Sequence, residues 1–172
     1  MSWLRSKRSV ATEAATAAMR PLLSLAQMNG GMSFSMWQDP YLLGYLSFVA
    51  SFFAKAETKN KIKPEDLGYA LQSAFASVSN MNGIEICKRA VELAESGDEE
   101  FQRGSYDATT VTLYSVNLLK DEEADPLVQE CNGAELLTRG MFPDQTDRSA
   151  VSGEMMLRTF INRVKQLRRD YA

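Results

Sequence analysis

The feature that most constrains this chain is the run over residues 39–54, DPYLLGYLSFVASFFA, which is apolar on nearly every side. A helix that is apolar all round is typical of a position in the interior of a protein. The apolar part of the run is about 14 residues long, whereas a helix needs about 20 residues to cross a bilayer. We therefore predict a central helix over residues 39–56 that the other helices of the chain cover.

The start of this helix is marked by Asp39 and Pro40. The carboxylate of an aspartate can accept hydrogen bonds from the free backbone N–H groups of a first helical turn. A proline at the first helical position gives up no hydrogen bond, because its nitrogen would have no partner there. The pair therefore predicts where the central helix begins.

Small residues form one narrow stripe along the central helix, at Gly44, Ser47 and Ser51. Such a stripe lets a neighbouring helix approach closely, and we interpret it as core. The alternative is a groove for a small apolar ligand or for a partner helix, bordered by this stripe and by Tyr41 and Tyr45. If the two tyrosines are buried, their hydroxyl groups need polar partners.

An alanine-rich stretch over residues 2–28 predicts an N-terminal helix. Pro21 lies within it, so we expect either a kink or a new helix at that point. The following Asn29, Gly30 and Gly31 are typical of a helix end. We divide the chain into an N-terminal helical arm with a Met-rich connector, residues 1–37, and a helical core domain, residues 38–172.

The N-terminus also bears on where the protein resides. Polar residues interrupt the apolar segment that a secretory signal would need, so we expect a cytoplasmic protein. The Arg-, Ser- and Ala-rich composition keeps import into an organelle as an alternative. Trp3 with the basic residues beside it could support peripheral membrane contact, although no transmembrane segment is predicted.

Two amphipathic helices are predicted next. The first begins at Pro64, and apolar residues then recur with helical spacing as far as Val78. Asn80 or Asn82 caps the second helix, and Gly97 ends it. We expect the two to form an antiparallel hairpin. The predicted buried stripe of the second helix consists of Ile84, Cys87, Ala90, Val91 and Ala94, with Ile86 and Leu93 beside it.

The region after Gly97 is harder to assign. We expect a short turn that begins at residues 98–100 and ends at Gly104, followed by a helix capped by Ser105 or Asp107. Because β-branched residues crowd residues 106–119, a strand is the alternative there. Asp125 with Pro126 repeats the Asp-Pro start of the central helix and predicts a short apolar helix. Residues 140–147 are predicted to form a loop.

The last predicted helix runs from about Ser149 to Asp170. Its apolar residues follow a heptad spacing at Leu157, Phe160, Val164, Leu167 and Tyr171. Charge is unevenly distributed, because residues 95–147 carry 13 acids and 3 bases whereas residues 148–172 carry 6 bases and 2 acids. These opposite blocks can pair within the fold or between copies of the chain, and such pairs would make assembly sensitive to salt.

The absence of histidine excludes the most familiar catalytic and metal-binding arrangements. The sequence contains no phosphate-binding loop, dinucleotide-binding glycine motif or nucleophile-elbow motif. Two acidic clusters, at residues 98–100 and 121–125, lack the spacing of a calcium-binding loop, and we predict no cofactor and no metal site. The cysteines, Cys87 and Cys131, are expected to be reduced. The net charge of −3 argues against nucleic acid as a partner.

We therefore expect an all-α protein, a single bundle-like domain of about six or seven helices around the central helix. The predicted function is a protein–protein interaction or assembly module, and we expect it to form a homo-oligomer. The alternatives are a binder of a small apolar ligand or lipid between helices, and a histidine-free enzyme. The residues predicted to contact a partner are Trp3, Met28, Met32, Met36, Trp37, Leu157, Phe160, Val164, Leu167 and Arg168.

Overall fold

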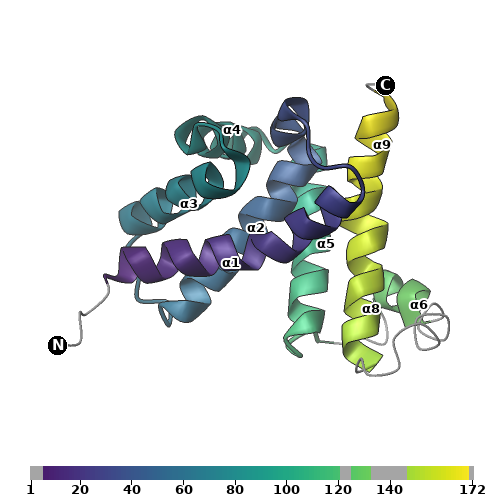
Figure 1. The fold of residues 1–172 in the computed structure, drawn as a ribbon. Helices are drawn as coiled ribbons and strands as arrows, with labels where there is room; N and C mark the ends of the chain where they lie inside the picture. The colour runs from purple at the N-terminus through teal and green to yellow at the C-terminus, as the bar shows by residue number, and fades with distance from the viewer. Residues whose placement is uncertain (1–5, 121–124, 133–146, 171–172) are drawn as a thin grey trace.

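The computed structural model describes residues 6–120, 125–132 and 147–170, and within these ranges it contains helices and connections but no strand. The predicted all-α class is confirmed. The helices, drawn in Figure 1, are α1 (Lys7–Met28), a short 3-10 helix (Phe34–Gln38), α2 (Pro40–Glu57), α3 (Pro64–Ser79), α4 (Gly83–Ser96), α5 (Glu99–Ser115), α6 (Pro126–Asn132), α8 (Asp147–Met156), a π-helical segment (Leu157–Ile161) and α9 (Asn162–Asp170).

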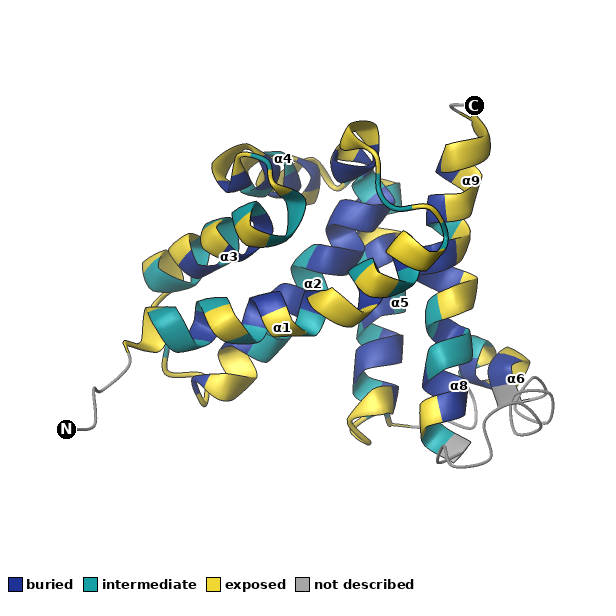
Figure 2. Cartoon of the chain, in the orientation of Figure 1, coloured by how far each residue is buried: buried dark blue, intermediate teal, exposed yellow. Residues whose placement is uncertain are grey.

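Helix α2 is the central helix that the sequence predicted. Its first turns are buried from Tyr41 to Leu46, and α1, α3, α4 and α5 all pack against it (Figure 2). One carboxylate oxygen of Asp39 accepts a hydrogen bond from the backbone N–H of Leu42 at 3.0 Å, and Pro40 occupies the first helical position. Both predictions about the start of the helix are confirmed.

Helix α1 runs without interruption through Pro21, so the alternative of a new helix starting there is wrong. It lies across α2 and α3 (Figure 1) and buries one stripe of small and apolar side chains against them. It ends at Met28, where Gly30 and Gly31 take positive φ angles of 97° and 81°. The glycines therefore end this helix as predicted.

Helices α3 and α4 follow as predicted and pack against each other. The side chain of Asn82 caps α4 by accepting from the backbone N–H of Ile84 at 3.0 Å, and Gly97 ends the helix in the left-handed conformation. A Cβ atom on Gly83 would lie 1.9 Å from the backbone oxygen of Gln72. The two helices therefore touch backbone to backbone at Gly83.

The buried face of α4 differs from the predicted one. Gly83, Ile86, Ala90 and Leu93 are buried, and of the five residues of the predicted stripe only Ala90 is among them. Ile84 and Val91 remain 60% and 53% exposed, Ala94 is exposed and Cys87 is half-buried. The physical reason is the contact at Gly83, which turns that residue and the side chains one, two and three turns later toward α2 and α3.

Helix α5 also differs from the expectation, because Gly104 lies inside it and does not end a turn. Asp98 caps α5 by accepting from the backbone N–H of Phe101 at 2.9 Å, so the predicted caps Ser105 and Asp107 are wrong and lie in the middle of the helix. The predicted helix is confirmed as far as Ser115, and the strand alternative is wrong for residues 106–115. Gly104 is needed for another reason, since a Cβ atom there would lie 2.0 Å from the backbone oxygen of Tyr41.

The C-terminal helices form a continuous rod from Asp147 to Asp170 that contains one π-helical segment. Its α8 part packs with α5 and α6 around a second apolar cluster that includes Val128, Cys131 and Met155. Asp125 accepts from the backbone N–H of Leu127 at 2.9 Å and so opens α6, as predicted. The predictions for residues 121–124 and 140–146 and for Tyr171 lie outside the described residues.

Candidate functional site

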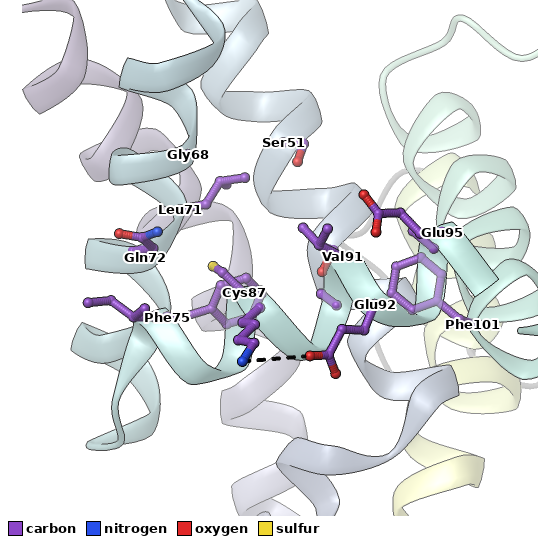
Figure 3. A pocket seen from close by; sticks show the side chains of 15 residues that line it. Ser51, Gly68, Leu71, Gln72, Phe75, Cys87, Val91, Glu92, Glu95 and Phe101 are labelled. Carbon is purple, nitrogen blue, oxygen red and sulfur yellow. Dashed lines mark ion pairs between the residues drawn. The ribbon is translucent and has the colours of Figure 1, made fainter. Parts of the chain in front are cut away.

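An open groove lies between α2, α3, α4 and the first turn of α5, with a volume of about 680 Å³ (Figure 3). Its lining is mainly apolar. The side chains of Leu71, Val91 and Phe101 point from three different helices toward the space between them. We take this groove as the candidate functional site, because it is a concave apolar surface that the described residues leave open.

One wall of the groove is the face of α4 that the sequence predicted to be buried. We call Ile84, Cys87, Val91 and Ala94 the α4 stripe; they are spaced by three, four and three residues, and all of them line the groove. The opposite face of α4 carries Ile86, which is fully buried. The α4 stripe is therefore a second apolar face of the same helix, and the described part of the chain leaves much of it open to solvent.

The facing wall comes from α3, through Gly68, Leu71, Gln72 and Phe75. Phe75 is 1% exposed and anchors this wall in the core. Around Gly68 the groove is open, because no described atom lies within 4 Å of where its Cβ would be. The groove therefore has room beside α3 for an incoming side chain.

The floor of the groove is formed by Ser47 and Ser51 of α2. The hydroxyl oxygen of Ser47 is buried and has no hydrogen-bond partner among the described residues. Burial raises the pKa of the Cys87 thiol to about 11, so this thiol is neutral at physiological pH. A neutral thiol is a poor nucleophile, and Cys87 is better understood as an apolar residue of the wall.

Charged side chains border the groove on α4. Lys88 lies 4.0 Å from Glu92, and Arg89 lies 3.7 Å from the same carboxylate. All three side chains are well exposed, so these pairs contribute little to folding. Glu95 lines the groove as well. The groove thus combines an apolar interior with a charged border, as contact surfaces between proteins do.

The structure assigns the predicted ligand-binding residues to two different places. Ser47 and Ser51 line the groove, as the alternative interpretation of the small-residue stripe required. Gly44 does not, because its Cβ position lies 2.1 Å from the backbone oxygen of Phe101 where α2 crosses α5. Tyr41 and Tyr45 are also not among the groove residues, and both point toward other helices.

The two tyrosines have the polar partners that the sequence required. The Tyr41 hydroxyl donates to a carboxylate oxygen of Asp107 at 2.5 Å, and the Tyr45 hydroxyl accepts from Thr159 at 3.4 Å. Burial, followed by the hydrogen bond to Asp107, raises the pKa of Tyr41 far above its ordinary value. Burial also raises the pKa of Asp107, although the hydrogen bond from Tyr41 opposes the shift.

A polar cluster beside Tyr41 joins the C-terminal rod to the start of α2. Arg163 donates to both carboxylate oxygens of Asp39, at 2.7 and 3.2 Å. It also lies 3.6 Å from Glu100, which in turn pairs with Arg103 at 2.9 Å. Because Tyr41 stays protonated at neutral pH and each charge in the cluster has an opposite partner, we assign this cluster a structural role.

Most of the residues predicted to contact a partner pack within this chain. Met36, Trp37, Phe160, Val164 and Leu167 are buried in the main core, and Met32 packs partly against it. The guanidinium of Arg168 donates to the backbone oxygens of Gly30 and Gly31. Met28 and Leu157 are 82% and 40% exposed, and Arg168 is exposed as well. Trp3 lies outside the described residues.

The α4 stripe was the open surface that the sequence predictions missed. A signal for it is present, because residues 84–94 carry seven apolar side chains on α4, more than one buried face of a helix requires. They divide into two stripes, one that packs inside and one that lines the groove. A set of apolar residues this wide on one helix is a reason to look for a second surface that the helix packs against.

Other kinds of site receive little support. Within the described residues no group of three histidine, cysteine, aspartate or glutamate side chains is placed to hold a metal ion. The acidic cluster at residues 121–124 lies outside those residues. In the same part of the chain, the helices fall short of the length and apolarity needed to span a membrane.

Comparison with known proteins gives no further guide. Neither a protein-family model, nor a curated protein, nor a solved structure matches this chain.

Proposed function

We propose that this protein is a helical interaction module that binds an apolar helix of a protein partner in the groove between α3 and α4. The observation that carries the proposal is the exposure of Ile84 and Val91, at 60% and 53%, on a regularly spaced stripe beside a concave apolar wall. Recognition of a helix in a groove uses such anchors at intervals of three and four residues.

The extent of the α4 stripe fits a helical partner. From Ile84 to Ala94 the stripe covers about 15 Å of helix axis at about 1.5 Å per residue. That is nearly three turns, over which a partner helix can place an apolar side chain every three or four residues. The charged residues at the border, such as Lys88 and Glu92, would fix the orientation of the partner more than they would add affinity.

The proposal can be tested by photo-crosslinking with purified protein in an extract of the source cell. A photoreactive amino acid replaces Val91 in the groove, and in the matched control it replaces Met28, which is 82% exposed and is not among the groove residues. We expect a covalent protein adduct from position 91 only. Addition of Ile84→Lys should abolish that adduct, because a buried lysine charge at the contact is costly.

The outcome that contradicts the proposal is equally clear. If positions 91 and 28 yield the same weak background of adducts, or if Ile84→Lys leaves the adduct from position 91 unchanged, the groove does not bind a protein. Circular dichroism of each variant checks that it is folded. We expect no change in the spectrum, because positions 28, 84 and 91 are all exposed.

A small apolar ligand is the second candidate, because two observations favour it. The groove volume of about 680 Å³ lies within the usual range for small-molecule sites, and the buried hydroxyl of Ser47 could bond a polar group of a ligand. Native mass spectrometry of freshly purified protein would then show an added mass. That mass should be lost in Ser51→Trp, which fills the floor of the groove.

A further inference from the structure

The charged side chains beside the groove are sorted along α4. Lys88 and Arg89 lie in the first half of the helix, whereas Glu92 and Glu95 lie in the second half. Lys88, Glu92 and Glu95 line the groove, whereas Glu85 and Arg89 are outside this lining. Along α4 the charges that line the groove therefore change from basic at Lys88 to acidic at Glu92 and Glu95.

A helix with this order of charges is complementary to a second copy of itself in the antiparallel orientation. The basic half of each copy then faces the acidic half of the other, and Lys88 comes beside Glu92 of the second copy. In a parallel orientation like charges would meet, which disfavours association. Complementarity of charge thus selects both a partner and a direction.

The α4 stripe is complementary in the same orientation. Its spacing of three, four and three residues is the spacing of helices that pack in pairs. When two antiparallel copies of α4 are centred on Arg89, Ile84 lies opposite Ala94 of the other copy, and Cys87 lies opposite Val91. Large side chains then face small ones at the two ends, and side chains of intermediate size meet in the middle.

We infer that the partner helix in the groove is α4 of a second copy of this chain, antiparallel to the first across a two-fold axis near Arg89. This inference rests on the proposed function and adds the identity and direction of the partner. The interface is isologous, so it closes at the dimer and leaves no open α4 stripe. One 14-residue helix from each copy makes a small interface, for which we expect a dissociation constant on the order of micromolar.

The test is a disulfide that can form only between two different chains. One chain keeps Cys87, and the other carries Cys87→Ala with Val91→Cys; Cys131 is buried in both. The two are mixed at about 100 µM, a hundredfold above a dissociation constant on the order of micromolar, and oxidised near pH 9, because burial raises the pKa of Cys87 to about 11. We expect the mixture to give several times more disulfide-linked dimer than either chain alone.

Two results would overturn the inference. If each chain alone crosslinks as well as the mixture does, the helices are not antiparallel in this register. If sedimentation equilibrium shows a monomer up to several hundred micromolar, no dimer forms through the groove. Circular dichroism of both chains verifies that the substitutions leave the fold intact.

Charge exchange provides an independent readout. Lys88→Glu should weaken the dimer about 3- to 10-fold, since a two-fold axis removes two exposed charge pairs at once. Adding Glu92→Lys to the same chain restores opposite charges across the axis and should recover most of that loss. The matched control is Lys88→Glu with Glu57→Lys, because Glu57 is exposed and outside the groove lining. This variant regains the same net charge without placing a lysine at the interface, so an equal rescue there would indicate a general effect of net charge and contradict the pairing.

The experiments separate failure of this inference from failure of the proposed function. If the chain is monomeric and position 91 still crosslinks to a different protein, the groove binds a partner, but that partner is not α4 of a second copy. If position 91 crosslinks to nothing and the chain is monomeric, both proposals are wrong.

Discussion

Two parts of the same stripe on α2 meet opposite environments. At Gly44 the backbone of α2 touches α5, where a Cβ atom would lie 2.1 Å from the oxygen of Phe101. One and two turns further along, Ser47 and Ser51 face the open groove. The three residues look alike in the sequence, yet one belongs to a closed helix crossing and the other two to a surface that a partner can reach.

The difference shows that a small residue permits close packing but does not cause it. At the closed crossing the opposing helix, α5, also carries a glycine. A Cβ atom on this residue, Gly104, would lie 2.0 Å from the backbone oxygen of Tyr41. On the groove side the glycine of α3, Gly68, has no described atom within 4 Å of that position. A glycine on each of the two helices allows α2 and α5 to touch at the closed crossing. No such pair of glycines brings α3 against α2 at the groove.

The two regions also differ in how their polar groups are satisfied. At the closed crossing the Tyr41 hydroxyl bonds Asp107, and the Ser105 hydroxyl donates to the backbone oxygen of Gly44 at 3.1 Å. In the groove, the buried Ser47 hydroxyl has no such partner among the described residues. A complete set of hydrogen bonds is typical of a finished contact, whereas an incomplete set is what a site awaiting a ligand would show.

The largest effect should come from filling the closed crossing. Gly104→Ala places a methyl group 2.0 Å from a backbone oxygen, so the two helices must separate, and we expect a loss of more than about 3 kcal/mol in the free energy of unfolding. The matched control is Gly68→Ala, which should stabilise α3 by about 0.5 to 1 kcal/mol. Urea unfolding followed by circular dichroism measures both. Equal effects of the two substitutions would contradict the contrast between the regions.

A second test compares the two faces of α4. Ile86 is fully buried whereas Ile84 is 60% exposed. Ile86→Ala should therefore lower the free energy of unfolding by about 3 kcal/mol, and Ile84→Ala should change it by less than about 0.5 kcal/mol. Thermal unfolding at a concentration well below dimerisation measures both values without a contribution from association. If Ile84→Ala were the more damaging variant, the predicted stripe would be the buried one after all.

The fold class and several helix starts could be predicted from the sequence, because they depend on local chemistry, although the start of α5 at Asp98 was missed. Asp39 with Pro40, Asn82 and Asp125 each open a helix through a side chain that satisfies nearby backbone N–H groups. The burial of the central helix followed from its composition alone. These features need no knowledge of which helices pack together.

The faces of the helices could not be predicted to the same degree, because they depend on contacts distant in sequence. Gly104 was predicted to end a short turn, and only its approach to Tyr41 explains why a glycine lies inside α5. The apolar spacing of α4 fitted two stripes equally well until the contact at Gly83 selected one. The π-helical segment shifts the predicted heptad, so that Ile161 joins Phe160 in the core and Leu157 is left 40% exposed.

A third prediction concerns how the closed region is tied to the C-terminal rod. Asp39 is 8% exposed and combines a helix cap with two hydrogen bonds to Arg163. Asp39→Ala removes both functions and should cost about 2 to 3 kcal/mol of unfolding free energy, because it also leaves the partly buried Arg163 without its nearest carboxylate. Asp39→Asn retains the cap and should cost about half as much. Chemical unfolding distinguishes the two, and an Asn variant as unstable as the Ala variant would show that the ion pair dominates and the cap contributes little.

The smallest effect concerns the pH dependence of the closed region through Asp107. Folding raises the pKa of this carboxyl, mainly through burial, so the folded state binds the proton more tightly than the unfolded state. The contribution of Asp107 to stability is therefore fully present below the unfolded pKa of about 3.9 and is lost as the pH rises through the folded pKa. Asp107→Asn keeps an oxygen that can accept from Tyr41 and removes the charge. We expect it to match the wild type at pH 3 and to be the more stable of the two at pH 7, by urea unfolding across that range.

The companion variant Asp107→Ala separates the charge from the hydrogen bond. It leaves the buried Tyr41 hydroxyl without its acceptor, so it should be less stable than Asp107→Asn by about 1 to 2 kcal/mol at every pH. If instead the difference between wild type and Asp107→Asn does not change between pH 3 and pH 7, the carboxyl titrates equally in the folded and unfolded states. Asp107 would then be more hydrated in the closed crossing than its burial implies. The contrast with the groove would rest on packing alone.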